Sequence, residues 1–91
     1  MKTNIDLEIL ENYLMHKIEE NPKFLRCTFW EIRVTLEVSE QDENEFLKFA
    51  KIRLENLGYV VYFTGAKFTY ENANRTVQPN ELIIAIKEDE I

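Results

Sequence analysis

Glycine, cysteine and histidine are scarce in this chain, which has two glycines, one cysteine and one histidine among 91 residues. Phosphate-binding loops need closely spaced glycines, and Gly58 and Gly65 provide neither a Walker loop nor a dinucleotide-binding fingerprint. A single Cys27 cannot form a disulfide within the chain, and one cysteine with one histidine is too few for a structural zinc site. We therefore expect no cofactor.

Long apolar runs are also absent. An uninterrupted run such as residues 82–86 is far shorter than the roughly 20 residues that cross a bilayer as a helix. Asp6, Glu8 and Glu11 interrupt the N-terminal segment, which therefore does not look like a secretion signal. These features predict a cytoplasmic protein without a membrane partner.

Positive charge is in deficit, because 11 lysines and arginines stand against 17 acidic residues and give a net charge of −6. Binding to nucleic acid requires clustered positive charge, so nucleic acid is a less favoured partner than protein. The composition, 45% hydrophobic and 31% charged, is that of an ordinary folded protein. A chain of this length has room for one domain, so residues 1–91 are expected to form a single α+β domain.

The first predicted element is a helix over residues 3–20. Thr3 is the expected N-cap with Asp6 at position N3, and Asn21-Pro22 ends the helix. Two apolar stripes lie on nearly opposite sides of this helix. The first consists of Leu7, Leu10, Leu14 and Ile18, and the second of Ile5, Ile9, Tyr13 and His16. A helix that is apolar on two sides is expected to contact two surfaces.

Residues 29–38 alternate between apolar and polar side chains, which predicts a half-buried strand. The apolar face of this strand would consist of Trp30, Ile32, Val34, Leu36 and Val38. Residues 23–28 are expected either to extend the strand or to approach it as a loop.

A second helix is predicted to follow, with its N-cap at Ser39, or at Asp42 with Glu45 at position N3. Its buried stripe would consist of Phe46, Leu47, Ala50, Leu54 and Leu57. Gly58 is placed where a helix commonly ends with a glycine in the left-handed conformation.

Two further strands are predicted, at residues 59–64 and at residues 82–87. The last segment is apolar at every position except Lys87, which is typical of a strand covered on both faces. Gly65 marks either a bulge or a tight turn, residues 67–70 are a possible extra strand, and residues 71–80 are expected to form an exposed loop.

The resulting order is α-β-α-β-β. The strands before and after the second helix are expected to run parallel, and residues 82–87 to lie between them, antiparallel to both. This order predicts two helices on one face of a three- or four-stranded mixed sheet.

No catalytic motif is evident. Cys27 and His16 are the only candidates for a nucleophile and its base, but a lone cysteine at the start of a strand is typically a small buried hydrophobe. Asp42, Glu43 and Glu45 form a cluster that the positive end of a helix already explains. We therefore expect neither enzyme activity nor a metal site.

Glu11 and Arg53 are charged residues beside the apolar stripes of the two helices. Because burial of ions is costly, the favoured interpretation is that each side chain reaches the rim of its own helix. The alternative is that the helices pack side by side and the two charges meet.

Eleven aromatic residues, 12% of the chain, are many for a small core, so some are expected to face outward. The candidate contact residues are Ile9, Tyr13, His16, Tyr59, Tyr62, Phe68, Tyr70 and Arg75. Such a surface fits a contact with protein, and the acidic balance favours this over the stacking of single-stranded bases.

The leading hypothesis is a small acidic protein-interaction domain without catalysis, which self-associates as a homo-oligomer. The abundance of Lys, Glu, Asn and Ile is typical of an AT-rich genome, such as that of a low-GC bacterium or its phage, where an inhibitor of a host or defence protein is an expected role. The alternatives are a single-stranded nucleic-acid-binding module and a ligand site formed between protomers.

Overall fold

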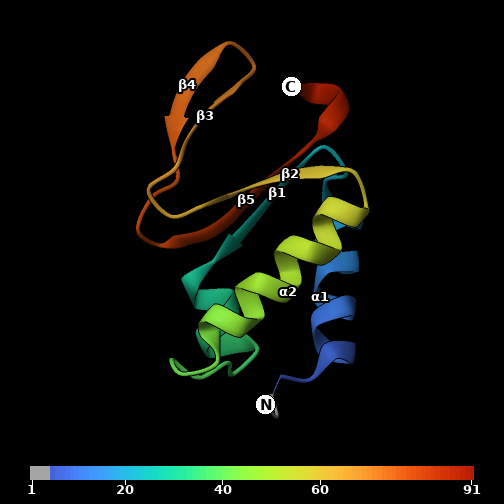
Figure 1. Ribbon diagram of the computed structural model, residues 1–91, viewed down its shortest axis with the longest axis vertical. Coiled ribbons are helices and arrows are strands. Elements are labelled where there is room, and N and C mark those ends of the chain that lie inside the picture. The colour runs from blue at the N-terminus through green and yellow to red at the C-terminus, as the bar shows by residue number, and fades with distance from the viewer. Residues whose placement is uncertain (1–4) are drawn as a thin grey trace.

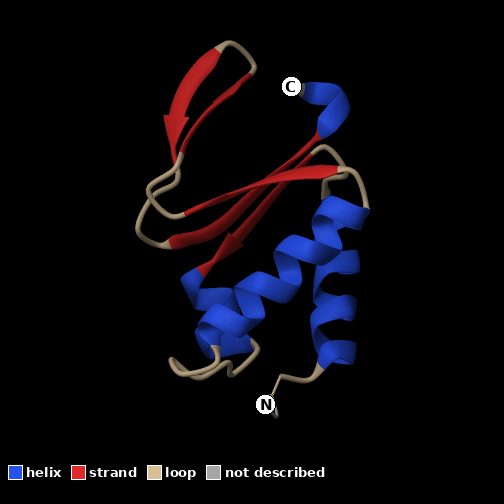
Figure 2. Ribbon diagram, viewed as in Figure 1, coloured by secondary structure: helices blue, strands red, loops and turns tan. Residues whose placement is uncertain are grey.

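A computed structural model describes residues 5–91 and shows three layers, with two helices, a sheet and a β-hairpin (Figures 1 and 2). The elements are α1 (Leu7–Glu20), β1 (Phe24–Thr28), the π-helix η1 (Trp30–Thr35), α2 (Glu43–Asn56), β2 (Tyr59–Phe63), β3 (Lys67–Tyr70), β4 (Ala73–Thr76), β5 (Glu81–Lys87) and the short 3₁₀ helix η2 (Glu88–Glu90). The predicted α+β fold, with two helices on one face of a three-stranded sheet, is confirmed.

The sheet has the strand order β1-β5-β2, and β5 pairs antiparallel with both neighbours. The central position predicted for residues 82–87 is therefore correct, and β1 and β2 run in the same direction without pairing with each other. The expectation of a mixed sheet is wrong in one respect, because every ladder in the described residues is antiparallel.

Strand β5 supplies the core on both sides of the sheet. Ile83 and Ala85 pack with α1 and α2, whereas Ile84 and Ile86 pack with the hairpin. All four are buried. This is why the segment is apolar at consecutive positions.

Helix α1 begins later than predicted. Asp6 is its N-cap and accepts hydrogen bonds from the backbone N–H groups of Glu8 and Ile9 at 3.0 and 3.2 Å. Thr3, the predicted cap, lies outside the described residues. Leu10 and Leu14 are buried as expected, but Leu7 is 55% exposed.

The strand predicted for residues 29–38 is wrong, because β1 ends at Thr28 and the chain turns into η1. A capping box starts the turn: Thr28 Oγ1 accepts from the Glu31 backbone N–H, and Glu31 Oε1 accepts from the Thr28 backbone N–H, both at 3.3 Å. The Leu36 N–H then donates to Glu31 O five residues back, at 2.9 Å, which is the π-helical pattern.

Helix α2 begins at one of the two predicted N-cap residues and ends at the predicted glycine. Asp42 is the N-cap residue, although its side chain makes no capping bond; Ser39 instead caps the preceding turn, with Oγ accepting from the Asp42 backbone N–H at 3.2 Å. Phe46, Ala50 and Leu54 are buried. Gly58, at φ 90°, ends the helix in the left-handed conformation as predicted.

The turn between β2 and β3 decides the question at Gly65, and the β3–β4 hairpin corrects the loop predicted for residues 71–80. Gly65, at φ 88°, lies in a tight turn in which the Ala66 N–H donates to Phe63 O at 2.9 Å. Residues 73–76 form β4 and pair with β3 across the turn residues Glu71 and Asn72, which both have positive φ, as in a two-residue hairpin turn of type I′.

Candidate protein interface

The aromatic residues predicted to face outward from the sheet are mostly covered by the hairpin. Phe68 is 8% exposed and stacks on Tyr62 with ring centroids 5.3 Å apart. Tyr70 lies against Phe24 at 4.8 Å. Tyr59 faces the helices and is 4% exposed. Tyr59, Tyr62, Phe68 and Tyr70 therefore do not form an open contact surface. The expectation that Tyr59 and Phe68 are exposed is wrong, because both are buried.

The other predicted contact residues lie apart from one another. Ile9 and His16 are exposed on α1, where His16 Nε2 lies 3.0 Å from Glu20 Oε1. Tyr13 turns inward, with its ring 6.4 Å from the Phe46 ring. Arg75 is exposed on β4, on the opposite side of the sheet from α1.

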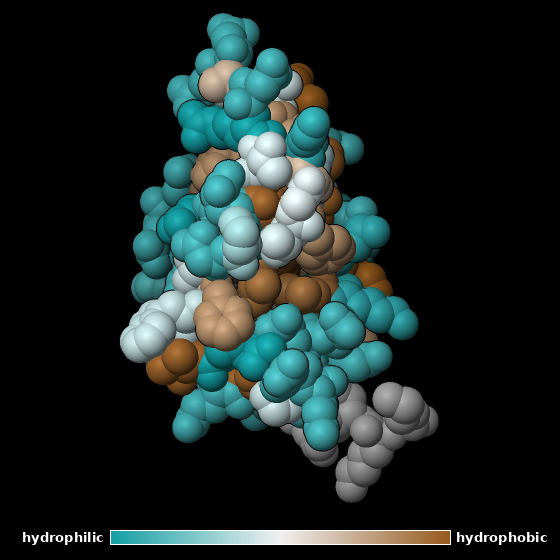
Figure 3. Space-filling model, turned by 90° about the vertical axis from the view of Figure 1, so that its left-hand side faces the viewer, coloured by the Kyte–Doolittle hydropathy of each residue, from teal (hydrophilic) through white to brown (hydrophobic). Residues whose placement is uncertain are grey.

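A different apolar surface is present on η1. Trp30 is 67% exposed, Val34 is 47% exposed and Phe29, just before the helix, is 43% exposed. Apolar side chains gather on the lower part of this side of the molecule (Figure 3). Trp30 and Val34 were predicted to be buried, and the helix turns them outward while Ile32 is completely buried. We call Phe29, Trp30 and Val34 the η1 patch.

Contacts with α1 hold the η1 patch in place. Lys17 Nζ lies 3.0 Å from Glu31 Oε2, which joins α1 to the first turn of η1. Burial opposes ionisation of Glu31, but the Lys17 ammonium and the hydrogen bonds from Thr28 outweigh it and lower the pKa of the carboxyl. The patch therefore lies on a capped and ion-paired segment.

Arg33 connects the η1 patch to a neighbouring groove. Its guanidinium carbon lies 5.1 Å from the centre of the Phe29 ring, and its Nε pairs with the Glu43 carboxylate. Glu43 also lines a groove of about 400 Å³ between α2 and the adjoining ends of β2 and β5. We call this the basic groove; it includes Leu47, Lys48, Lys51, Phe63 and Leu82.

The two lysines of the basic groove differ from most cations of this acidic chain. Lys17, Arg26, Arg33 and Arg53 each pair with a glutamate. Within residues 5–91, neither Lys48 nor Lys51 forms an ion pair, and both are exposed beside three apolar side chains. The groove thus combines apolar walls with uncompensated positive charge.

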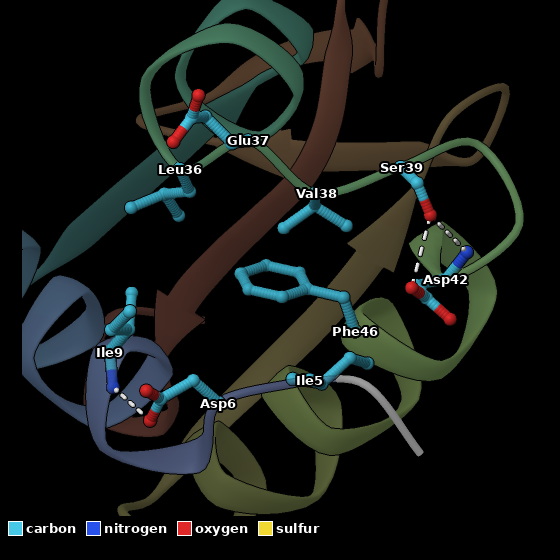
Figure 4. A pocket seen from close by; sticks show the side chains of 9 residues that line it. All are labelled: Ile5, Asp6, Ile9, Leu36, Glu37, Val38, Ser39, Asp42 and Phe46. Carbon is cyan, nitrogen blue, oxygen red and sulfur yellow. Dashed lines mark hydrogen bonds between the residues drawn. The ribbon is translucent and has the colours of Figure 1, made fainter.

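A second hollow, of about 330 Å³, lies between the start of α1 and the end of η1 (Figure 4). Phe46 and Val38 face each other within it, while Asp6, Glu37 and Asp42 lie at its rim. Asp6 caps α1, Asp42 accepts from Ser39 Oγ at 3.0 Å, and the Glu37 carboxylate points away from the Phe46 ring. Its carboxylates therefore do not converge on a common point.

The residues considered for catalysis are separated. Cys27 is completely buried between the sheet and the helices, and burial raises the pKa of its thiol to about 11. His16 is exposed on α1, so the two do not form a nucleophile–base pair. Among the described side chains, no group of three or more His, Cys, Asp or Glu residues is placed to hold a metal ion, Asp42, Glu43 and Glu45 included.

Over residues 5–91, no helix has the length and apolar character needed to cross a membrane. The chain matches no protein-family model, and no curated protein and no solved structure shows significant similarity to it.

The η1 patch and the basic groove were missed by sequence reasoning, although one signal pointed to the patch. Thr28 and Glu31 are spaced as the threonine and glutamate of a capping box, which predicts a helix start directly after Thr28. The groove has no comparable signal, because Lys48, Phe63 and Leu82 come from three separate elements.

Proposed function

We propose that this protein is a non-catalytic interaction domain that self-associates through the η1 patch. The observation that carries the proposal is the exposure of Trp30, at 67%, beside two half-exposed apolar residues on a well-anchored helical turn. Tryptophan is enriched among residues that dominate binding at protein interfaces, and a segment whose backbone is already held in place loses little entropy when it binds.

A second copy is the partner to test first, because self-association needs no other component. The net charge of −6 makes copies repel one another, so a patch that faces the same patch of a second copy is favoured when it is locally neutral. The η1 patch meets this condition, since its three residues are uncharged and Arg33 and Glu43 beside them are paired.

Single-stranded nucleic acid is not proposed. The stacking side chains required for that function were Tyr59, Tyr62, Phe68 and Tyr70, and these pack into the two cores of the fold. The net acidic charge weighs in the same direction.

The experiment is sedimentation of the wild-type chain from micromolar to millimolar concentration, with Trp30 fluorescence recorded in parallel. Trp30 is the only tryptophan, so its emission reports on this patch alone. We expect the mass to rise with concentration and the emission to shift to shorter wavelength as the indole leaves water.

The variants Trp30→Ala and Val34→Asp are expected to remain monomeric at concentrations where the wild type associates. Leu7→Asp is the matched control, because Leu7 is also a half-exposed apolar residue but lies at the start of α1. A wild-type chain that stays monomeric with unchanged emission would overturn self-association through this patch.

A further inference from the structure

We infer that the basic groove of one copy receives the acidic segment 88–91 of a second copy. This inference rests on the proposed self-association and adds a second contact between copies, next to the η1 patch that Arg33 and Glu43 join to the groove. It is carried by the charges of the two surfaces and by their placement at opposite ends of one strand.

The basic groove is the best acceptor for an acidic segment among the described surfaces. Besides Lys48 and Lys51, the exposed cations without an ion pair in the described residues are Lys67 and Arg75 on the hairpin. The hollow beside both of those cations has one apolar wall, Phe68, which is buried, and a second hollow that Arg75 alone borders also contains the Arg26–Glu81 ion pair. The basic groove instead offers two partly exposed apolar side chains, Leu47 and Phe63, beside its lysines, together with the buried Leu82.

Segment 88–91 has the matching chemistry. Glu88, Asp89 and Glu90 are exposed in the single turn of η2, and Ile91 directly follows with 66% of its surface exposed. Glu90 lies 3.7 Å from Lys23, whereas Glu88 and Asp89 have no ion pair within the described part of the chain. The segment therefore presents free carboxylates next to an apolar side chain, as the groove presents ammonium groups next to apolar walls.

Strand β5 keeps the two surfaces of one molecule apart. Leu82, near its start, lines the groove, and Lys87, at its end, precedes the acidic segment. Five extended residues separate these positions by roughly 16 Å. The Glu88 N–H donates to Gly58 O at 2.9 Å and holds the segment at its own end, which lies near the hairpin and away from the start of α2 (Figure 1).

The contact must therefore join two molecules. Two copies can exchange their segments reciprocally about a two-fold axis and close as a dimer, or each copy can pass its segment to the next in a ring or an open chain. In either arrangement, we expect each copy to use both its groove and its acidic segment.

The test is a charge-swap experiment with two variants of the full chain, checked for folding by circular dichroism. One variant carries Lys48→Glu and Lys51→Glu, and the other carries Glu88→Lys and Asp89→Lys. Each alone brings like charges together, so we expect association at least about tenfold weaker than in the wild type. An equimolar mixture restores opposite charges at every contact, and we expect it to associate again.

Two further variants serve as controls. Lys67→Glu with Arg75→Glu makes the same change of charge on the hairpin, and we expect it to associate as the wild type does. Lys48→Gln with Lys51→Gln removes charge without reversing it and should weaken association to a smaller extent.

The outcomes separate this inference from the proposed function. If Trp30→Ala abolishes association but the charge variants do not weaken it, the inference is wrong and the proposed function stands. If both charge variants weaken association and their mixture does not recover, the pairing of these two surfaces is also wrong. A wild type that never associates removes the proposed function itself.

Discussion

Arg53 on α2 donates two hydrogen bonds to the Glu11 carboxylate on α1, from Nε at 2.7 Å and from Nη2 at 2.6 Å. Both side chains remain about two-fifths exposed. The interpretation favoured from the sequence, that each charge separately reaches the rim of its own helix, is therefore wrong, and its alternative is correct: the helices pack side by side and the two charges meet. The Arg53 hydrogen bond lowers the pKa of Glu11, and the pKa of Arg53 is raised in turn.

A double-mutant cycle with Glu11→Gln and Arg53→Met is expected to show a favourable coupling between these residues. The coupling should be small and should shrink as salt is added, because the pair is exposed to solvent. Arg53→Lys should lose most of it, since lysine cannot donate in the planar fork that this carboxylate accepts. Urea denaturation at low and high salt measures the coupling, and equal values in both would contradict an ionic origin.

Replacement of Phe68 tests whether the hairpin covers the sheet. Phe68→Ala removes a buried ring from the second core, so we expect the free energy of unfolding to fall by roughly 3 kcal/mol. Thr69→Ala, at the neighbouring exposed position, removes only the solvent-exposed hydrogen bond from Thr69 Oγ1 to Asn74 Oδ1 and should lower it by no more than about 1 kcal/mol. Chemical denaturation distinguishes the two, and equal small effects would show that the hairpin does not pack on the sheet.

Acid should destabilise the fold partly through Glu31. Its pKa in the folded state lies below the ordinary value of 4.5, because Lys17 and Thr28 outweigh the effect of burial. The stability this provides is present above the unfolded pKa and is lost as pH falls from about 4.5 toward the folded pKa. Glu31→Gln keeps a capping side chain but removes the charge, so its stability should fall less steeply below pH 4.5.

The control for this measurement is Glu40→Gln, at an exposed glutamate without an ion pair among the described residues. Its stability should follow that of the wild type across the acid range. A Glu31→Gln curve with the wild-type slope would show that the Lys17–Glu31 pair does not contribute.

Cys27 should react slowly with an aromatic disulfide reagent in native buffer. The thiol is completely buried, and a pKa of about 11 leaves only about a thousandth of it as thiolate at pH 8. In urea the rate should rise as the unfolded fraction rises, and the unfolded chain should react as a free thiol does. Rapid and complete labelling of the folded protein would mean that the thiol is reachable without unfolding.

The elements predicted correctly from the sequence are those whose residue pattern is compatible with only one type of local structure. Strand β5 is apolar at consecutive positions because both its faces are covered, and Gly58 occupies a backbone conformation that favours glycine. The helical stripes of α2 were also correct, since Phe46, Ala50 and Leu54 recur at a helical spacing that few other structures satisfy.

Residues 29–38 were mispredicted because their apolar pattern fits both a strand and a helix. Apolar residues at every second position also recur at every fourth, and residues four apart lie near one face of a helix. Ile32 and Leu36 take the inner face of η1, while Trp30 and Val34 take the outer face. The capping box of Thr28 and Glu31 favours the helix over the strand. This signal lies in the spacing of two polar residues, whereas the strand was predicted from the spacing of the apolar ones.

The candidate interface was hidden from sequence reasoning for a related reason. An aromatic side chain is as compatible with a core as with a surface, so the hairpin could bury Phe68 and Tyr62 while η1 exposed Trp30. Which group is covered depends on contacts between residues far apart in the chain, and composition carries no information about these.

The order of the strands also bears on how the chain reaches its fold. Phe24 in β1 pairs with Ile86 in β5, so both outer strands must wait for a partner that is made after them. Pairing between strands so far apart in the sequence is slow to form. Until β5 has paired, Leu25, Cys27 and Tyr59 lack the core that they pack into in the folded protein. A ribosome-bound chain that stops before residue 81 would therefore be a target for chaperones and proteases, even with both long helices already synthesised.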